Sequence, residues 1–264
     1  MIIHLKNRSL LRVSGPDAES FLQSQFSNDI SKINEQNLQL NAYCQYQGKI
    51  IALIWVFKID ANFYLSLPKE LKNSVLGKLN LYKMMSNLQI EDYSEDLYQY
   101  GVVDEKIDGM KNLINNLAIF ISQKKLNHDD DHNSWELNCI KNELPEVTSK
   151  FSERYTPQLL NLDIDSLGVS FNKGCYPGQE VVARMHYLGK PKRRLFRFTS
   201  DFNVFIGDTL NILSSKSLKS SGEVIRVVNF NGKSDFLATF ETRHICDSIY
   251  LNDNQNQIVN IIDE

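Results

Sequence analysis

The feature that most constrains the fold is a pair of apolar segments separated by only three residues. Residues 49 to 59 form a nearly continuous apolar run, and the turn Asp60-Ala61-Asn62 leads into a second apolar segment at residues 63 to 67. Strands joined by so short a turn pair antiparallel, because a parallel pair needs a crossover connection of about a dozen residues or more. The pattern therefore predicts an antiparallel meander and disfavours alternating βαβ winding.

Patterns on both sides of this hairpin extend the prediction. A helix is expected at residues 17 to 26, where apolar side chains recur at helical spacing. Another is expected from Pro68 to Tyr82, since proline is tolerated in a first helical turn. A weak helix is expected at residues 107 to 115. The expected strands are residues 10–13, 36–46, 88–92, 98–103, 118–122 and 135–140. This mixture predicts an α+β domain with an antiparallel sheet.

The character of the chain changes near residue 190. Short strand patterns follow one another, separated by turns rich in Gly, Asn, Asp and Ser. These patterns lie at residues 195–199, 209–213, 222–230, 236–238 and 258–262. Such spacing is typical of a small β-barrel or sandwich. We therefore expect two domains, an α+β region at residues 1–189 and a C-terminal β-barrel at residues 190–264.

Composition narrows the class of protein. The chain has 264 residues and a net charge of −3, which gives no overall attraction to nucleic acid or to an anionic membrane. No segment approaches the roughly 20 apolar residues of a membrane span, and residues 1 to 12 lack a secretory signal pattern. The cysteines form no CxxC pair, which disfavours a zinc ribbon and a four-cysteine cluster site. These observations favour a cytoplasmic protein in a reducing compartment, and nothing in the sequence requires more than a monomer.

The most informative segment for function surrounds Cys175. An extended apolar segment at residues 167 to 171 leads into a glycine-containing turn, and a helix is expected to begin near Pro177. A thiol just ahead of a helix N-terminus, and two residues from Lys173, lies among unpaired N–H donors and positive charge, which favour the nucleophilic thiolate. The alternative is a small, inert side chain packed under the turn. Spacing alone leaves both readings open.

The same segment resembles a family signature. The residues that carry the resemblance are Lys173-Gly174-Cys175-Tyr176-Pro177-Gly178-Gln179-Glu180. They are similar to the signature of the YgfZ family, folate-binding relatives of the glycine-cleavage T protein that are connected with iron–sulfur proteins and with tRNA-thiomodifying enzymes. Further segments that resemble the family are Gly15–Ala18, Phe21–Gln25, Pro157–Leu162 and Leu188–Arg193. The resemblance is thus spread over most of the chain.

The resemblance implies both a fold and a function. It implies an α+β folate-binding domain of T-protein type, and an accessory role in the assembly or repair of iron–sulfur proteins with tetrahydrofolate or a derivative as ligand. Cys175 would be the essential thiolate and a transient ligand to a cluster iron, with Lys173 lowering its pKa. A single cysteine cannot hold a cluster, so a client or assembly protein would complete the coordination. An accessory role is favoured over enzymatic turnover, and no other metal ligand is indicated.

Other members of the motif would support this thiol. Gly174 and Gly178 would let the backbone approach a ligand closely. Gln179, Glu180 and Arg184 would hold the loop in place. Glu180 precedes Arg184 by four residues, which is the favourable order for a helical ion pair. The motif therefore predicts a rigid loop that presents the thiol.

In the family, a tryptophan on the strand at residues 135–140 helps to hold the pterin ring of folate, and Trp135 occupies that position. An aromatic face stacked on a flat heterocycle is one physical reason for a tryptophan there, and core packing is the other. Three positions depart from the family pattern. Glu143 replaces the usual glycine, Cys139 replaces a polar residue, and a second tryptophan is replaced near Arg8.

Two other catalytic functions have less support. A tetrahydrofolate-dependent aminomethyl transferase would need an acid or base beside the folate nitrogens, and Asp29 is a candidate by residue type only. A cysteine hydrolase would pair Cys175 with His186, the nearest histidine in sequence. On a continuous helix, His186 lies roughly 12 Å from the helix start, which is too far for proton transfer.

Two charged runs suggest binding rather than catalysis. Five cations fall within eight residues, at Lys190, Lys192, Arg193, Arg194 and Arg197. They could receive a folate polyglutamate tail or an RNA backbone, or they could form a solvated linker, and the net acidity of the chain counts against direct RNA binding. The run from His128 to His132 has zinc-ligating residue types, but its polar flanks favour a solvated loop.

Overall fold

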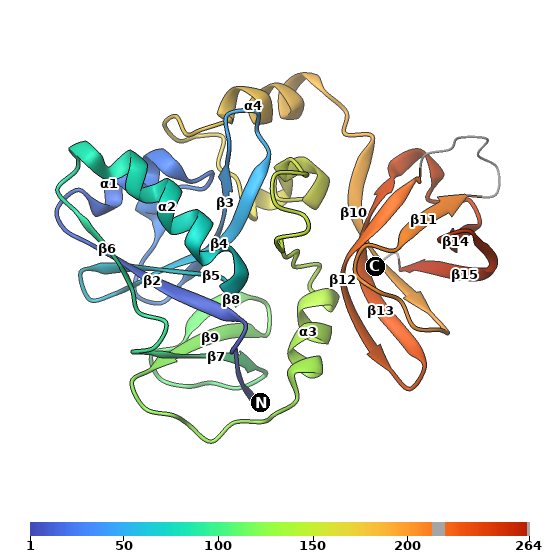
Figure 1. Cartoon of the computed structure of the whole chain (residues 1–264), viewed down its shortest axis with the longest axis horizontal. Coiled ribbons are helices and arrows are strands. Elements are labelled where there is room, and N and C mark those ends of the chain that lie inside the picture. The colour runs from blue at the N-terminus through green and yellow to red at the C-terminus, as the bar shows by residue number, and fades with distance from the viewer. Residues whose placement is uncertain (213–219, 263–264) are drawn as a thin grey trace.

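The computed structural model describes residues 1–212 and 220–262, and the strands of this part of the chain form three sheets (Figure 1). Two open sheets and the long helices build the N-terminal part. A closed barrel builds the C-terminal part at the other end of the molecule. The pairings between these strands are antiparallel, so the predicted fold class is confirmed.

The predicted hairpin lies in the middle of a five-stranded sheet with the order β3-β4-β5-β2-β6. Its strands are β2 (Arg8–Ser14), β3 (Leu38–Cys44), β4 (Ile50–Ile59), β5 (Asn62–Pro68) and β6 (Gln89–Asp92). Ile59 pairs with Asn62, and Asp60 in the turn has a φ of 52°, which an aspartate tolerates better than most side chains. The meander read from the sequence is therefore correct.

The two faces of this sheet contact different cores, which explains why β4 is apolar almost throughout. Ile54 and Val56 pack in a cluster with α1 (Ala18–Gln25) and α2 (Lys72–Tyr82), the two helices that cover one face. Leu53, Trp55 and Phe57 point the other way, into a cluster that extends to the rest of the molecule. A strand buried on both faces loses the polar alternation of a half-exposed strand.

A second, four-stranded sheet has the order β1-β7-β9-β8. Its strands are β1 (Ile2–His4), β7 (Tyr98–Val103), β8 (Lys111–Ile114) and β9 (Leu117–Ser122). The weak helix expected at residues 107 to 115 is wrong, because the segment forms β8 and pairs with β9 across a turn in which Asn115 has a φ of 46°. Pairing with a neighbouring strand overrides a weak helical pattern.

The strand expected at residues 135 to 140 is also wrong, because these residues lie in α3 (His132–Lys141). The Asp131 side chain accepts a hydrogen bond from the Ser134 amide at 3.1 Å, so an aspartate caps the helix N-terminus. Trp135, Cys139 and Ile140 are the buried residues of this helix, at positions i, i+4 and i+5. That spacing places them on one helical face.

The C-terminal barrel has the order β10-β13-β12-β11-β14-β15. Its strands are β10 (Arg193–Ser200), β11 (Thr209–Ile212), β12 (Gly222–Phe230), β13 (Lys233–Glu241), β14 (Ile249–Leu251) and β15 (Asn254–Ile262). The expected strands correspond to all of these except β14, although residue 213 lies outside the described residues. The division of the chain at residue 189 stays a prediction.

Apolar packing joins the barrel to the N-terminal part. Leu195 and Ile225 of the barrel belong to the same buried cluster as Trp55 and Trp135. The helix α3 lies between the barrel and the four-stranded sheet (Figure 1). Within residues 1–212 and 220–262, none of the helices has the length and apolar character needed to cross a bilayer.

Candidate functional site

The segment around Cys175 lies between α1 and the last helix of the N-terminal part, α4 (Gln179–Leu188). The extended segment expected at residues 167 to 171 is instead irregular, and the Ser170 amide donates to the Ser27 carbonyl at 2.9 Å. The helix begins two residues after Pro177, with Gly178 as its N-cap. The thiol therefore precedes the helix by one compact turn, which closes when the Gln179 amide donates to the Tyr176 carbonyl at 3.2 Å.

Gly178 fixes this turn against the connection between β3 and β4. It has a φ of +84°, and a Cβ placed on it would lie 2.5 Å from the Gln45 carbonyl oxygen and 2.8 Å from the Gly48 Cα. Two backbone segments thus touch where a side chain would separate them. Gly48 itself has a φ of +72° and faces Val181. Gly174 differs, because a Cβ there meets no atom within 4 Å.

Lys173 anchors the other end of the turn. Its ammonium donates hydrogen bonds to the carbonyl oxygens of Gln23, Phe26 and Asn28, at the end of α1. Burial lowers the pKa of Lys173 to about 8, and the nearby Asp29 opposes that effect. In the described part of the chain no hydrogen bond joins Lys173 to Cys175. The structure therefore gives this lysine a clear role in holding the loop, and its expected influence on the thiol stays a prediction.

Cys175 is exposed and lines an open groove of about 550 Å³. The residues that line the groove are Ser24, Tyr46, Cys175, Tyr176, Pro177, Gly178, Gln179, Glu180 and Val181. Two other cysteines, Cys44 and Cys139, are buried, and burial raises the pKa of each thiol to about 12. The exposed thiol of the motif is thus open to a reaction partner, whereas these two are not.

Of the remaining motif residues, one is buried in the fold and others are exposed at the surface. Tyr176 is buried, and burial raises its pKa. Glu180 and Arg184 are exposed, and the expected ion pair between them does not form in the described structure. What holds α4 in place is Gln158, a buried side chain that donates to the Val182 carbonyl at 2.7 Å. Gln158 belongs to a segment that resembles the family, which is the signal that could have identified it.

Trp135 lies in the core rather than at a binding surface. Only 2% of its surface is exposed, and its ring meets the Trp55 ring edge to face with the centroids 6.2 Å apart. A Cβ on Gly101 would lie 2.4 Å from the Trp135 ring, so the backbone of β7 closely covers this side chain. The surroundings of Trp135 therefore do not fit a stacked pterin ring.

Charged side chains fill the space next to these tryptophans. The Arg8 guanidinium lies over the Trp55 ring at 3.5 Å from its centroid, donates to Ser66 and pairs with Glu146. Arg226 of the barrel is buried nearby, where it pairs with Glu136 at 2.8 Å and donates to a backbone carbonyl. Near Arg8, where the family pattern predicts a second tryptophan, this chain thus has a buried ion pair, and that replacement stays a prediction.

Glu143, at a position where the family pattern has a glycine, adopts a left-handed backbone conformation. This residue comes directly after Asn142, the C-cap of α3, and has a φ of 48°. A glycine adopts such a conformation without steric cost, which accounts for the glycine expected there from the family pattern.

The other candidate residues have structural partners. Asp29 accepts hydrogen bonds from Gln23 and Ser31 and caps a short 3-10 helix, and these bonds lower its pKa. His186 stacks on Phe171 with the ring centroids 3.8 Å apart and does not line the groove that contains Cys175. Neither residue is therefore positioned to act as the acid or base of the two alternative reactions.

The basic run contributes mainly to internal ion pairs. Arg194 pairs with Asp163, Arg197 pairs with Asp235 at 2.7 Å, and Arg193 lies 3.4 Å from Glu241. The lysines of the run, Lys190 and Lys192, are exposed. Three of the five cations thus hold the barrel together or attach it to the rest of the molecule. They are not arranged as a patch for a polyanion.

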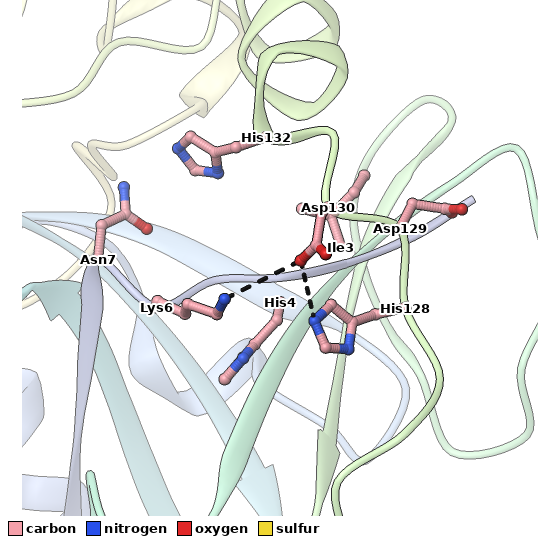
Figure 2. A pocket seen from close by; sticks show the side chains of 8 residues that line it. All are labelled: Ile3, His4, Lys6, Asn7, His128, Asp129, Asp130 and His132. Atoms are coloured by element: carbon pink, nitrogen blue, oxygen red, sulfur yellow. Dashed lines mark ion pairs between the residues drawn. The ribbon is translucent and has the colours of Figure 1, made fainter.

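The histidine run is a loop, as expected, up to the start of α3 (Figure 2). Asp130 lies 3.4 Å from the His128 ring and 4.0 Å from the Lys6 ammonium. His4 faces His128 with the ring centroids 5.5 Å apart, and burial and this neighbour lower the pKa of His4. No group of residues within 1–212 and 220–262 is arranged to hold a metal ion.

Comparisons with known proteins agree with the resemblance. No family model matches the chain. An uncharacterized protein of Haemophilus influenzae is 30% identical over 243 residues, which cover 87% of this chain and 85% of that protein. The tRNA-modifying protein YgfZ of Colwellia psychrerythraea is 27% identical, covering 75% of this chain and 71% of the relative, and that of Hamiltonella defensa is 26% identical, covering 88% and 80%.

A solved structure has the same fold. The glycine cleavage system aminomethyltransferase T from Bartonella henselae matches with a TM-score of 0.74 at 11% identity, covering 100% of this chain and 84% of that one. With the sequence relatives, this places the chain in the YgfZ family, on a glycine-cleavage T-protein fold.

Proposed function

We propose that this protein is an accessory factor for the assembly or repair of iron–sulfur proteins, and that it acts through the thiolate of Cys175. The relatives are named tRNA-modifying proteins. We propose that the connection to tRNA runs through client enzymes that need iron–sulfur clusters. Direct contact with RNA is not part of the proposal, because most of the basic run is used in internal ion pairs.

The observation that carries the proposal is the exposure of Cys175 on a loop that the rest of the molecule holds rigidly; the other exposed cysteine, Cys246, lies in the barrel part, outside the motif. Lys173 fixes the start of the loop through three carbonyl oxygens, and Gly178 fixes its end against Gly48. A cysteine that served only for packing would be buried, as Cys44 and Cys139 are. A preorganised thiol needs little further ordering when it meets a partner.

The chemistry open to such a thiol is limited and specific. A thiolate can bind the iron of a cluster carried by a client, or attack the outer sulfur of a client persulfide, so that the new S–S bond forms on Cys175 as the client's own thiolate leaves. One cysteine supplies one ligand, so the client must hold the other coordination positions. In the groove, Gln179 and Glu180 lie beside Cys175 and could orient an approaching group. We expect this role to require no turnover of a small substrate.

Folate binding is a separate part of the proposal, supported by relatedness to the T protein and not by the environment of Trp135. When bound, tetrahydrofolate would supply one-carbon chemistry, and no step proposed for Cys175 depends on it. Titration with 5-formyltetrahydrofolate, followed by the fluorescence of Trp55 and Trp135, tests this part. If the quenching is saturable and is lost in Trp135→Phe, then Trp135 is part of the folate site. Quenching that the variant retains would place folate elsewhere.

Complementation tests the main proposal. Cells that lack their own copy of the gene receive wild type, Cys175→Ala or Cys139→Ala, and cluster-dependent enzyme activities are measured together with soluble protein level. We expect Cys175→Ala to accumulate normally and to restore little activity, because its side chain is exposed. Cys139→Ala controls for loss of a thiol elsewhere. Full restoration by Cys175→Ala would show that the thiol is not needed.

A further inference from the structure

The groove beside Cys175 has an unusual charge for a protein connected with tRNA and folate. Of the nine residues that line it, one is a carboxylate, Glu180, and none is a cation. Of the two motif cations, Lys173 is committed to backbone carbonyls, and Arg184, exposed on α4, does not line the groove. Phosphate backbones and polyglutamate tails are held by arginine and lysine side chains. The groove therefore lacks the groups that would attract either polyanion.

Exposed apolar side chains extend from this groove. Tyr46 lines it and is 68% exposed, and it lies beside Tyr82 at the end of α2, whose pKa it raises. The same end of α2, with the 3-10 turn that follows it (Lys83–Met85), carries three further exposed residues. They are Leu81, Met84 and Met85, with exposed fractions of 70%, 83% and 98%. We call Tyr46, Leu81, Tyr82, Met84 and Met85 the tyrosine–methionine surface.

From these observations we infer that the tyrosine–methionine surface docks the iron–sulfur client protein whose cluster or sulfur meets Cys175. This inference rests on the proposed function and adds the surface that recognises the client. Tyrosine and methionine are enriched at the centre of protein interfaces, and methionine adapts to partners of different shape. The five residues of the surface are uncharged, the groove lining adds one carboxylate, Glu180, and Lys83 between Tyr82 and Met84 is partly exposed, so this area is close to neutral. An apolar protein surface complements them better than a polyanion does.

The fold also gives a reason for the position of Tyr46. It lies in the connection between β3 and β4, next to Gly48, which touches the motif loop. The docking surface and the thiol are therefore held by the same backbone contact. A client that covers Tyr46 is brought to the mouth of the groove in which Cys175 lies.

The test removes the surface and leaves the thiol. The variant combines Tyr46→Ser, Met84→Ser and Met85→Ser, and a matched control combines Phe205→Ser, Phe230→Ser and Ile258→Ser, three exposed apolar residues of the barrel part. We expect the surface variant to lower the restored cluster-dependent activity at least fivefold and the control to change it less than twofold. The rate at which iodoacetamide alkylates Cys175 should stay within twofold of wild type in both. Met85→Ser alone, at a side chain with almost no contacts to lose, should lower the activity in the same direction.

The outcomes separate this inference from the proposed function. If Cys175→Ala fails while the surface variant restores full activity, the docking surface is wrong and the thiol function stands. If Cys175→Ala restores activity, the proposed function itself is wrong. Purified bulk tRNA and 5-formyltetrahydrofolate are also tested as protecting agents against alkylation. If either one slows alkylation of Cys175 in wild type but not in the surface variant, then RNA or folate occupies the surface and the protein partner is overturned.

Discussion

The two regions that the sequence marks for function, the Cys175 loop and the Trp135 interior, turn out to have opposite surroundings. The loop is exposed on a rigid support and carries a thiol that faces a groove. The interior is closed by the backbone of β7 and by buried ion pairs, and its own thiol, Cys139, is inaccessible. A family motif therefore identifies positions, and only their surroundings decide which positions can react.

Thiol reactivity gives the largest expected difference between the two regions. In the native protein we expect iodoacetamide to alkylate Cys139 at least about a thousandfold more slowly than Cys175, because the buried thiol must wait for the structure to open. Burial also raises the pKa of Cys139 to about 12, which removes its thiolate at neutral pH. Mass spectrometry of timed digests measures both rates, and Cys44 should follow Cys139. Rates for Cys139 and Cys175 within tenfold of each other would show that the interior opens readily.

Stability gives the next effect, at the ion pairs of the interior. Arg226→Met removes a buried guanidinium and the hydrogen bonds that it donates to Glu136 and to a backbone carbonyl. Breaking a buried pair in this way costs about 3–5 kcal/mol of unfolding free energy. Urea denaturation measures the loss, with Arg243→Met as a control, since Arg243 forms its ion pair at the surface. A loss no larger than that of the control would mean that the interior pair adds nothing to stability.

The sequence predicts much of this fold, because strong patterns agree with tertiary contacts. The hairpin of β4 and β5 is buried on both faces and could be read directly. The pattern at residues 135 to 140 predicts a strand instead of α3 because the ten residues of this helix contain only three buried ones, and its clearest helix signal is the Asp131 cap that precedes it. The composition of residues 107 to 115 predicts a weak helix, but the segment forms β8 because pairing with β9 determines its conformation.

The candidate site likewise has features that the sequence predicts and features that it does not. The turn that places Cys175 ahead of a helix follows from local sequence, so it could be predicted, whereas the exposure of the thiol could not, because spacing alone also allows a packed cysteine. The contact of Gly178 with Gly48 and the carbonyl partners of Lys173 join residues more than a hundred positions apart, and no local pattern contains them. Trp135 was assigned to folate by family position, which carries no information on the Gly101 backbone that covers it.

The two glycines of the motif, Gly174 and Gly178, should differ in how much an added side chain destabilises the loop. Gly178→Ala should cost at least about 2 kcal/mol of unfolding free energy, because it combines a left-handed φ with a Cβ that meets the Gln45 carbonyl. Gly174→Ala should change stability by less than about 1 kcal/mol, since its Cβ would meet open space. Thermal or urea unfolding compares the two. Equal losses would mean that the loop is not fixed through Gly178.

The last expected effect concerns the support of the loop and depends on pH. Burial lowers the pKa of Lys173 to about 8 in the folded protein, below the ordinary value of 10.5. Between these two values the unfolded chain holds more protons than the folded one, so the stability contributed by this residue rises with pH from about 8 to 10.5 and is constant below pH 8.

The difference in unfolding free energy between wild type and Lys173→Met isolates this effect, because the tyrosines and the other lysines titrate in both proteins. We expect the difference to shift in favour of wild type across that interval, whereas Lys173→Arg, which cannot lose its proton there, should show no such gain. The three carbonyl oxygens around the ammonium favour its charged form, so they oppose the effect of burial. A shift in the opposite direction would mean that these hydrogen bonds outweigh burial. The loop would then be supported by a charged lysine throughout the physiological range.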